Sequence, residues 1–226
     1  KDVEKLKKIV EKKNIKCMLG FNLRYNDCYK FIKEKIKRKN FFGKIYKVDL
    51  FNGEFLPNYH PYEDYRISYA SRKNLGGGVL LTQIHELDLI LSLFGKPKKI
   101  YSFCDKTSNL EIDVEDSVDA LMIMKNKMIL NLHLDYITNP PSRYLKIYAH
   151  KKNLYWDYYK NSIEIFDKEK MKLKKISFKK LKRNLMFEKE IKDFINSKPS
   201  NSKLPNIKTG IETLKLAISI KKGHII

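Results

Sequence analysis

The chain of 226 residues is long enough for one domain with a hydrophobic core, and its aromatic fraction of 12% excludes a disordered chain. The formal net charge of +21 arises from 47 basic and 26 acidic residues, but only six of the basic residues are Arg. Proteins that read bases or clamp phosphates use Arg heavily, so the charge indicates solvated Lys-rich faces rather than a specific nucleic-acid surface. Three irregularly spaced cysteines fit neither a disulfide framework nor a zinc site, which favours a reducing cytoplasm, and no apolar run reaches the ~20 residues of a membrane span.

The first elements read as the end of a domain that lies mostly upstream. Residues 2–13 place apolar side chains at helical spacing, and residues 15–21 read as a short apolar strand. A helix that leads into an apolar strand is half of a βαβ unit, which belongs to a parallel sheet with further strands. Because the chain begins at Lys1 inside this helix and without an initiator Met, we expect a fragment that has lost a preceding α/β domain.

The next segment predicts a helix, a strand and a long connection. Asn26 or Asp27 is positioned to cap the helix, and residues 44–51 read as the strand. Residues 52–75 form a polar and aromatic loop of a length that is typical of lids and binding loops. Residues 78–94 then predict the most apolar helix of the chain, which should be buried nearly all round.

Short strands joined by tight turns follow, and two helices close the chain. This pattern predicts an antiparallel meander rather than βαβ units. We therefore expect residues 22–226 to form one α+β domain, with a large open, mainly antiparallel sheet and helices on one face. The expected strands are 98–104, 115–124, 127–137, 143–150, 153–159, 162–167 and 171–178, and the expected closing helices are 182–197 and 206–222.

The most informative segment is a glycine-rich entry into the apolar helix. Glycines 76–78 allow close backbone approach, and Thr82 and His85 follow inside the helix. An imidazole with a pKa near neutrality suits proton transfer from a hydroxyl, whereas the alternative is a core histidine satisfied by Asp88 or by a backbone carbonyl. No metal site is expected, because His85 and Glu86 are adjacent and no second His lies four residues away.

At these residues the chain resembles a family. The stretch from Leu75 to Asp88, LGGGVLLTQIHELD, is similar to the signature of the glucose–fructose oxidoreductase, inositol dehydrogenase and rhizopine-catabolism (Gfo/Idh/MocA) family. Residues 20–25 resemble the exit from the family's dinucleotide domain, and residues 204–206 with the helix after them resemble its C-terminal return helix. The resemblance covers the chain from about Lys16 to Ile220.

The resemblance implies an N-terminal Rossmann domain for NAD or NADP and a C-terminal α+β domain with the substrate site and the oligomer interface. Residues 1–21 would then be the remnant of the dinucleotide-binding domain. The implied reaction is hydride transfer between the nicotinamide and a carbon of a sugar, nucleotide sugar or cyclitol. The family's Glu-Lys-Pro lysine and its phosphate-binding glycines would precede Lys1, so the chain would hold no cofactor-binding residues and would be inactive alone.

His85 matches the catalytic histidine of the family, but its partner departs from the pattern. Thr82 stands where the family has Asp, and three residues rather than the common four separate it from His85. A threonine hydroxyl forms hydrogen bonds, but it cannot act as a carboxylate base or hold an imidazolium as well as Asp does.

Substrate contacts are expected from two further places. Asn22 and Arg24 follow the strand that leaves the dinucleotide domain, where ligands meet α/β sheets, although Arg24 fits an interface salt bridge equally well. The long loop contributes aromatic faces and forked donors that suit hydroxyls or an anionic sugar, or else packs on a neighbouring subunit. Its candidates are Tyr65, Arg66, Tyr69 and Arg72.

The sequence therefore predicts the substrate-binding and oligomerisation domain of a cytoplasmic NAD(P)-dependent oxidoreductase. It should bind a sugar-like substrate and assemble as a homodimer or homotetramer through its sheet, without metal or membrane. One alternative is a non-catalytic assembly domain of the same fold, which Thr82 in place of Asp would tolerate. The other is a basic nucleic-acid-binding module. The sequence argues against it, because it holds no zinc knuckle, no glycine-rich aromatic RNA motif and no Arg-rich stripe.

Overall fold

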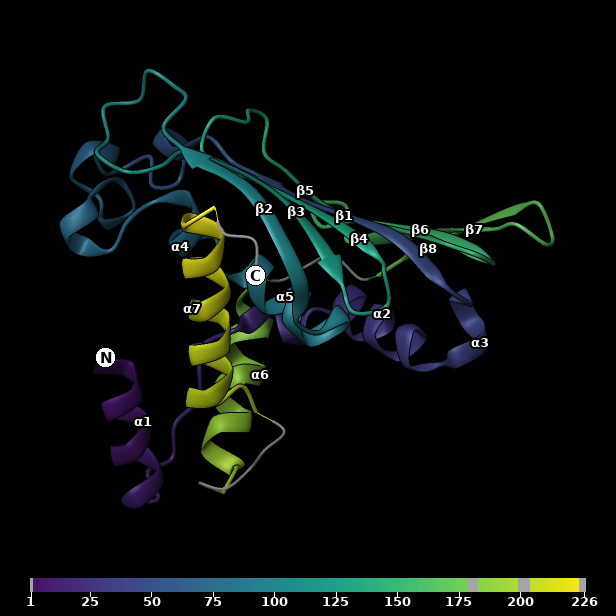
Figure 1. The fold of residues 1–226 in the computed structure, drawn as a ribbon, viewed down its shortest axis with the longest axis horizontal. Coiled ribbons are helices and arrows are strands. Elements are labelled where there is room, and N and C mark those ends of the chain that lie inside the picture. Colours follow the sequence, from purple (N-terminus) through teal and green to yellow (C-terminus); the bar gives the residue numbers. More distant parts are fainter. Residues whose placement is uncertain (1, 179–182, 199–203, 224–226) are drawn as a thin grey trace.

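The fold is an α+β arrangement in which one large sheet is covered by helices on one face, as the sequence predicted (Figure 1). The computed structural model describes residues 2–178, 183–198 and 204–223. The eight strands lie in the order β2-β3-β4-β1-β5-β6-β7-β8. Their bounds are β1 Ile45–Gly53, β2 Pro97–Asp105, β3 Ser117–Met124, β4 Ile129–Asp135, β5 Ser142–Ala149, β6 Lys152–Asp157, β7 Ser162–Asp167 and β8 Lys172–Ser177.

Strand β1 lies in the middle of the sheet, although it comes first in the chain. It pairs antiparallel with β5 and parallel with β4, and this is the one parallel pairing of the eight-stranded sheet. A parallel pairing requires a crossover, which here consists of the long loop, two helices and strands β2 and β3. The crossover places the glycine-rich segment against the end of the central strands.

The hydrophobic core lies between the sheet and the helices. Alternate strand residues such as Val48, Leu50, Met122 and Leu132 are almost fully buried on the helix side, while their chain neighbours face the other way. The alternation holds from β2 to β7, so one contiguous core fixes the sheet on its helices.

Seven α-helices lie among the described residues, at α1 Asp2–Lys12, α2 Asp27–Lys37, α3 Lys39–Phe42, α4 Val79–Thr82, α5 His85–Phe94, α6 Arg183–Asn196 and α7 Ile207–Lys221. Asn26 caps α2 by accepting hydrogen bonds from the Cys28 and Tyr29 amides at 2.8 and 3.2 Å. Asn206 caps α7 in the same way, accepting from Lys208 and Thr209. Both caps satisfy amides that a helix N-terminus leaves without partners.

Two expected elements differ in the structure. Residues 15–21 do not form a strand, because no described strand lies beside them; Leu19 instead donates to the Pro205 carbonyl at 2.6 Å. The apolar helix expected over 78–94 is interrupted at Gln83, whose φ of −96° and ψ of 32° are not helical. The break leaves the short helix α4 and the buried helix α5 in its place.

No single helix of the described ranges is long and apolar enough to cross a membrane. Only the segments Lys73–Thr82 and His85–Phe94 taken together reach the required length and composition, and they are bent by 45°. Leu87, Leu89 and Ile90 of the second segment are buried in the core.

Candidate substrate and catalytic site

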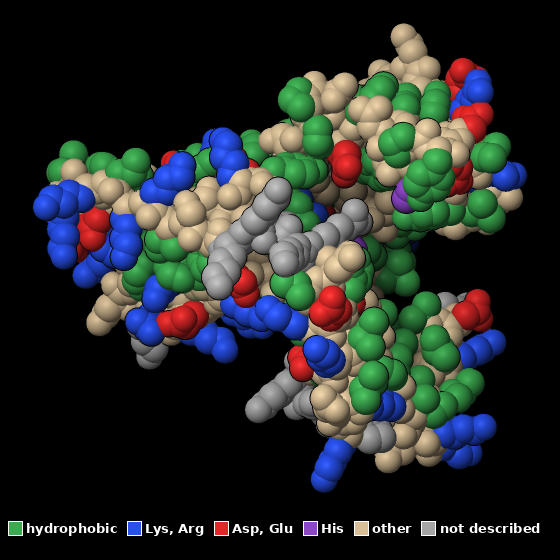
Figure 2. All heavy atoms as spheres, turned by 180° about the vertical axis from the view of Figure 1, so that it is seen from behind, with side chains coloured by type: hydrophobic (Ala, Val, Ile, Leu, Met, Phe, Trp, Pro, Cys, Tyr) green, Lys and Arg blue, Asp and Glu red, His purple; other side chains and the backbone are tan. Residues whose placement is uncertain are grey.

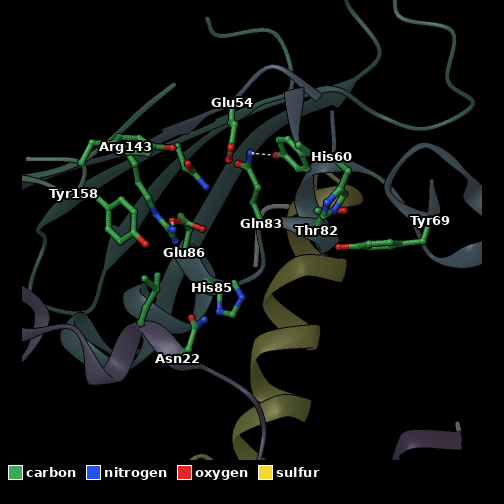
Figure 3. Close-up of a pocket in the computed structure, with 14 residues that line it drawn as sticks. Asn22, Glu54, His60, Tyr69, Thr82, Gln83, His85, Glu86, Arg143 and Tyr158 are labelled. Atoms are coloured by element: carbon green, nitrogen blue, oxygen red, sulfur yellow. Dashed lines mark hydrogen bonds and ion pairs between the residues drawn. The ribbon is translucent and has the colours of Figure 1, made fainter. Parts of the chain in front are cut away.

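A cavity of about 430 Å³ lies where the central strands end beside the start of α5 (Figure 3). This volume lies within the range of small-molecule sites, and the lining is mainly polar with several tyrosine rings. Both features suit a hydroxylated ring better than an apolar ligand. The lining residues are Asn22, Leu23, Asn52, Glu54, Tyr59, His60, Tyr69, Thr82, Gln83, His85, Glu86, Arg143, Tyr158 and Tyr159.

Two of the three glycines before α4, Gly77 and Gly78, pack closely against other parts of the chain. A Cβ added to Gly77 would lie 2.4 Å from the Tyr69 carbonyl oxygen and 2.7 Å from that of Ala70. Gly78 has a φ of +107°, and its amide donates to the Ala70 carbonyl at 2.9 Å. Gly77 therefore holds the long loop close to α4, which brings Tyr69 to the cavity, while a Cβ added to Gly78 would lie 2.3 Å from the Glu115 carboxylate.

The break at Gln83 explains how four nearly consecutive side chains reach one cavity. On a continuous helix, Thr82, His85 and Glu86 would share one face at i, i+3 and i+4, whereas Gln83 would be turned by about 100° from Thr82. The interruption between α4 and α5 lets all four line the same space. Figure 3 shows them with His85 beside Asn22 at one side of the cavity.

His85 begins α5 and is partly exposed at the cavity. The ring of Phe21 meets the imidazole edge-on, with ring centroids 5.9 Å apart. Nearby on α5, both Asp88 carboxylate oxygens accept from Arg24, at 2.6 and 2.8 Å. The position of His85 fits proton exchange with a ligand hydroxyl in the cavity.

Gln83 is held by its amide nitrogen. The Nε2 group donates to the Tyr59 hydroxyl at 3.0 Å and to the Asp135 carbonyl at 3.1 Å. Asp135 ends β4, and its carboxylate in turn accepts from the Ile137 and Thr138 amides. The Asp135 end of this contact is thus fixed by the turn that follows β4.

A buried ion pair closes another side of the cavity. Glu86 is fully buried and pairs with Arg143, whose guanidinium lies 4.8 Å from the centre of the Tyr158 ring. Burial raises the pKa of the Glu86 carboxyl, while Arg143 and Asn52 act to lower it. Asn52 and Arg143 lie opposite each other in the β1–β5 register, so strand pairing brings them together.

The tyrosine hydroxyls of the cavity are neutral donors and acceptors. Burial raises the pKa of Tyr159 to about 12, with the nearby Glu54 carboxylate acting in the same direction. Burial likewise raises the pKa of Tyr59 far above neutrality. Both groups therefore remain protonated at physiological pH and can hydrogen-bond to hydroxyls without charge.

The structure brings together half of the residues predicted for the site. Asn22, Tyr69, Thr82 and His85 line the cavity, whereas four others lie outside it. Arg24 forms the salt bridge to Asp88. The remaining three belong to the outer part of the loop: Arg66 pairs with Asp64 and Glu111, the Tyr65 hydroxyl accepts from the Glu111 amide, and Arg72 is exposed.

Sequence reasoning missed Asn52, Gln83, Glu86, Arg143 and Tyr158 as site residues. Gln83 and Glu86 lie next to Thr82 and His85 in the sequence. Their polarity could have marked them as site residues, since polar side chains inside an apolar helix need partners. No group of three His, Cys, Asp or Glu side chains in the described part of the chain is arranged to hold a metal ion.

The model of the GFO/IDH/MocA C-terminal domain matches residues 29–155, more than half of the chain. The chain therefore belongs to the Gfo/Idh/MocA family, as its glycine-rich motif indicated. No curated protein sequence matches it significantly.

Solved structures share the fold at low sequence identity. Levoglucosan dehydrogenase in complex with NADH superposes with a TM-score of 0.79 at 14% identity, over 93% of this chain and 64% of that one. UDP-N-acetylglucosamine 3-dehydrogenase GnnA from Acidithiobacillus ferrooxidans gives 0.74 at 16% identity, over 98% and 65%. The WlbA dehydrogenase from Bordetella pertussis, in complex with NADH and UDP-GlcNAcA, gives 0.74 at 17%, over 98% and 65%. The chain thus spans less than two thirds of each of these structures.

Proposed function

We propose that this chain is the substrate-binding domain of an NAD(P)-dependent oxidoreductase that acts on a sugar, nucleotide sugar or cyclitol. The observation that carries the proposal is His85 beside Asn22 at a polar cavity that Thr82 and several tyrosine residues also line. The family membership supports the reaction class, and the similar structures include enzymes with NADH bound. Asn22, Tyr69 and Thr82 are proposed to contact the substrate or its reacting hydroxyl.

In this proposal the nicotinamide cofactor is held by a preceding domain and reaches the substrate at the cavity. Gly77 packs against the carbonyls of Tyr69 and Ala70, and Gly78 against the Glu115 side chain, so in this proposal the cradle that a pyrophosphate needs belongs to a preceding domain. When bound, a nicotinamide cofactor accepts or donates hydride at the substrate carbon. His85 takes the proton of the substrate hydroxyl as that carbon is oxidised, and returns it in the reverse reaction. Thr82 supports the hydroxyl by hydrogen bonding rather than as a base.

We also propose assembly through the open face of the sheet. Side chains that alternate with the core point away from the helices, and several are apolar and 40–52% exposed: Tyr101, Phe103, Leu121 and Ile129 on β2, β3 and β4. A contiguous apolar face on a sheet marks an interaction surface. A second copy of the chain is the proposed occupant of this face.

We further propose a cytoplasmic location. The free thiols of Cys17, Cys28 and Cys104 fit a reducing compartment.

The basic charge does not favour a nucleic-acid function. Figure 2 shows Lys and Arg side chains dispersed over one face with acidic side chains between them, rather than gathered in a stripe. Dispersed charge of this kind promotes solubility and weak, salt-sensitive contacts.

The proposal is tested with the full-length protein and a panel of D-glucose, myo-inositol, levoglucosan and UDP-N-acetylglucosamine. Absorbance at the reduced-nicotinamide band is followed with NAD⁺ and with NADP⁺. Turnover of at least one compound is expected, together with absence of micromolar NADH binding to residues 1–226 alone. No turnover by a protein that binds NAD(P)H and assembles normally would favour the non-catalytic assembly domain, which Thr82 in place of Asp makes the second candidate.

A further inference from the structure

The side-chain carbonyl of Gln83 is a buried acceptor at the cavity. Gln83 is 4% exposed, and its Oε1 atom has no hydrogen-bond partner among the residues that the structure describes. A buried carbonyl without a donor costs free energy, so such a group needs an explanation. Because Gln83 lines the cavity, a ligand is in a position to supply the missing donor.

The orientation of this amide is fixed by its partners. The two Nε2 hydrogens are used by the Tyr59 hydroxyl and the Asp135 carbonyl. A carbonyl oxygen only accepts, so a flipped amide would set the Gln83 oxygen against the Asp135 oxygen. The hydrogen-bond network therefore determines which end of the amide remains open to the cavity.

The surroundings of Gln83 also favour a donor on the ligand. Figure 3 shows the Gln83 and Glu54 side chains pointing toward the same part of the cavity. A carboxylate and an amide oxygen together form an acceptor-rich wall, which attracts hydroxyl and N–H groups and disfavours a carbonyl or carboxylate on the ligand.

We propose that Gln83 determines specificity by accepting a hydrogen bond from a substrate hydroxyl other than the one that reacts. The inference rests on the proposed function, since His85 is assigned the reacting hydroxyl at the same cavity. The substrate class is thereby narrowed to polyols with a second free hydroxyl on the ring held in the cavity. Loss of that hydroxyl leaves the Gln83 carbonyl buried without a donor and is expected to reduce kcat/KM about tenfold to a hundredfold.

The test combines a side-chain change with substrate analogues. For whichever panel compound the full-length protein turns over, kcat/KM is measured on that compound and on each of its singly deoxygenated analogues. Wild type should reject one analogue by about tenfold to a hundredfold. The readout is the ratio of kcat/KM on the parent compound to kcat/KM on each analogue. Gln83→Met keeps the size of the side chain but removes the acceptor, so this ratio should fall to within about threefold of unity for the rejected analogue. The ratios for the other analogues should stay as in wild type.

Two further variants separate specificity from folding. Asn126→Leu removes a side-chain oxygen that accepts from the Met128 backbone N–H in the turn before β4. This turn lies at the opposite end of β4 from Asp135, so the variant should leave every ratio unchanged. Tyr59→Phe frees one Nε2 hydrogen and loosens the Gln83 amide, so it should give an intermediate ratio. This variant takes the place of Gln83→Met in the test if Gln83→Met fails to fold.

The outcomes distinguish this inference from the function on which it rests. Turnover with equal analogue ratios in wild type and Gln83→Met overturns the role of Gln83 alone. If no panel compound is turned over, calorimetry with the same four compounds decides: binding that Gln83→Met weakens at least tenfold supports the inference, and absence of binding to wild type overturns both.

Discussion

At the scale of single residues, His133 is the side chain whose environment most clearly predicts a pH dependence. Its Nδ1 and Nε2 atoms lie 2.8 Å from Asp119 and 2.9 Å from Asp135, and its ring stacks on Phe51. The bond to Asp135 is the largest cause that raises the pKa of His133, while partial burial acts against it. Because the folded-state pKa lies above the ordinary 6.5, the stability from this histidine is full below about pH 6.5 and is lost as pH rises through the raised pKa.

His133→Gln is therefore expected to lower the melting temperature more at pH 6 than at pH 9. Thermal unfolding measured across this range by circular dichroism provides the test. His150→Gln is the matched control, because His150 meets the Tyr46 hydroxyl rather than two carboxylates. An equal loss for His133→Gln at both pH values would contradict the charge-based interpretation.

Four of the residues expected from the sequence line the candidate cavity, and the reasons are visible in the structure. His85 and Thr82 follow a glycine motif, and motifs of contiguous residues are readable without a fold. Asn52 and Arg143 meet only through the β1–β5 register, and periodicity does not specify which strands pair. Gln83 was overlooked because a continuous helix was expected where the chain breaks.

At the scale of elements, the pair Arg24–Asp88 joins the turn after residue 21 to helix α5. Asp88 is 1% exposed and Arg24 is 18% exposed, and the contact is bidentate. Removal of one partner from a buried pair leaves an uncompensated charge, which costs several kcal/mol. The pair therefore holds the cavity's Asn22 side in place, and it lies within the domain rather than at the domain interface considered from the sequence.

Arg24→Ala is expected to lower the free energy of unfolding by about 3 kcal/mol in urea titrations. Arg66→Ala is the matched control, because its bidentate partner Asp64 is exposed, and exposed ion pairs contribute little to stability. Substrate KM should change little in Arg24→Ala at temperatures where it is folded. A large rise in KM with normal stability would instead assign Arg24 to substrate binding.

Element positions were largely predictable, whereas their arrangement was not. The strands expected from 98 to 178 agree with β2–β8 within about two residues at most ends, because alternation and turn residues mark them locally. The central place of β1 and its parallel partner β4 depend on contacts far apart in the chain. The expected strand over 15–21 failed because a parallel strand needs neighbours, and none lies among the described residues.

At the scale of the whole molecule, the open sheet face predicts self-association. Leu121→Lys combined with Ile129→Lys adds charge to exposed apolar positions on β3 and β4 without touching the core. Light scattering after size exclusion should show a homo-oligomer for wild type and a smaller species for the double variant, with unchanged circular dichroism. Met171→Lys combined with Leu173→Lys is the matched control. Both residues are exposed at the start of β8, and this double variant should leave the assembly intact.

The proposed proton transfer by His85 is the step on which the activity depends most directly. In the full-length protein, His85→Asn keeps the approximate size but removes the titratable group, so kcat on the turned-over substrate is expected to fall by about 10²–10⁴ with cofactor affinity and melting temperature retained. A core histidine predicts the reverse, a lower melting temperature with nearly normal turnover. Wild-type kcat in a folded His85→Asn enzyme would contradict the catalytic assignment.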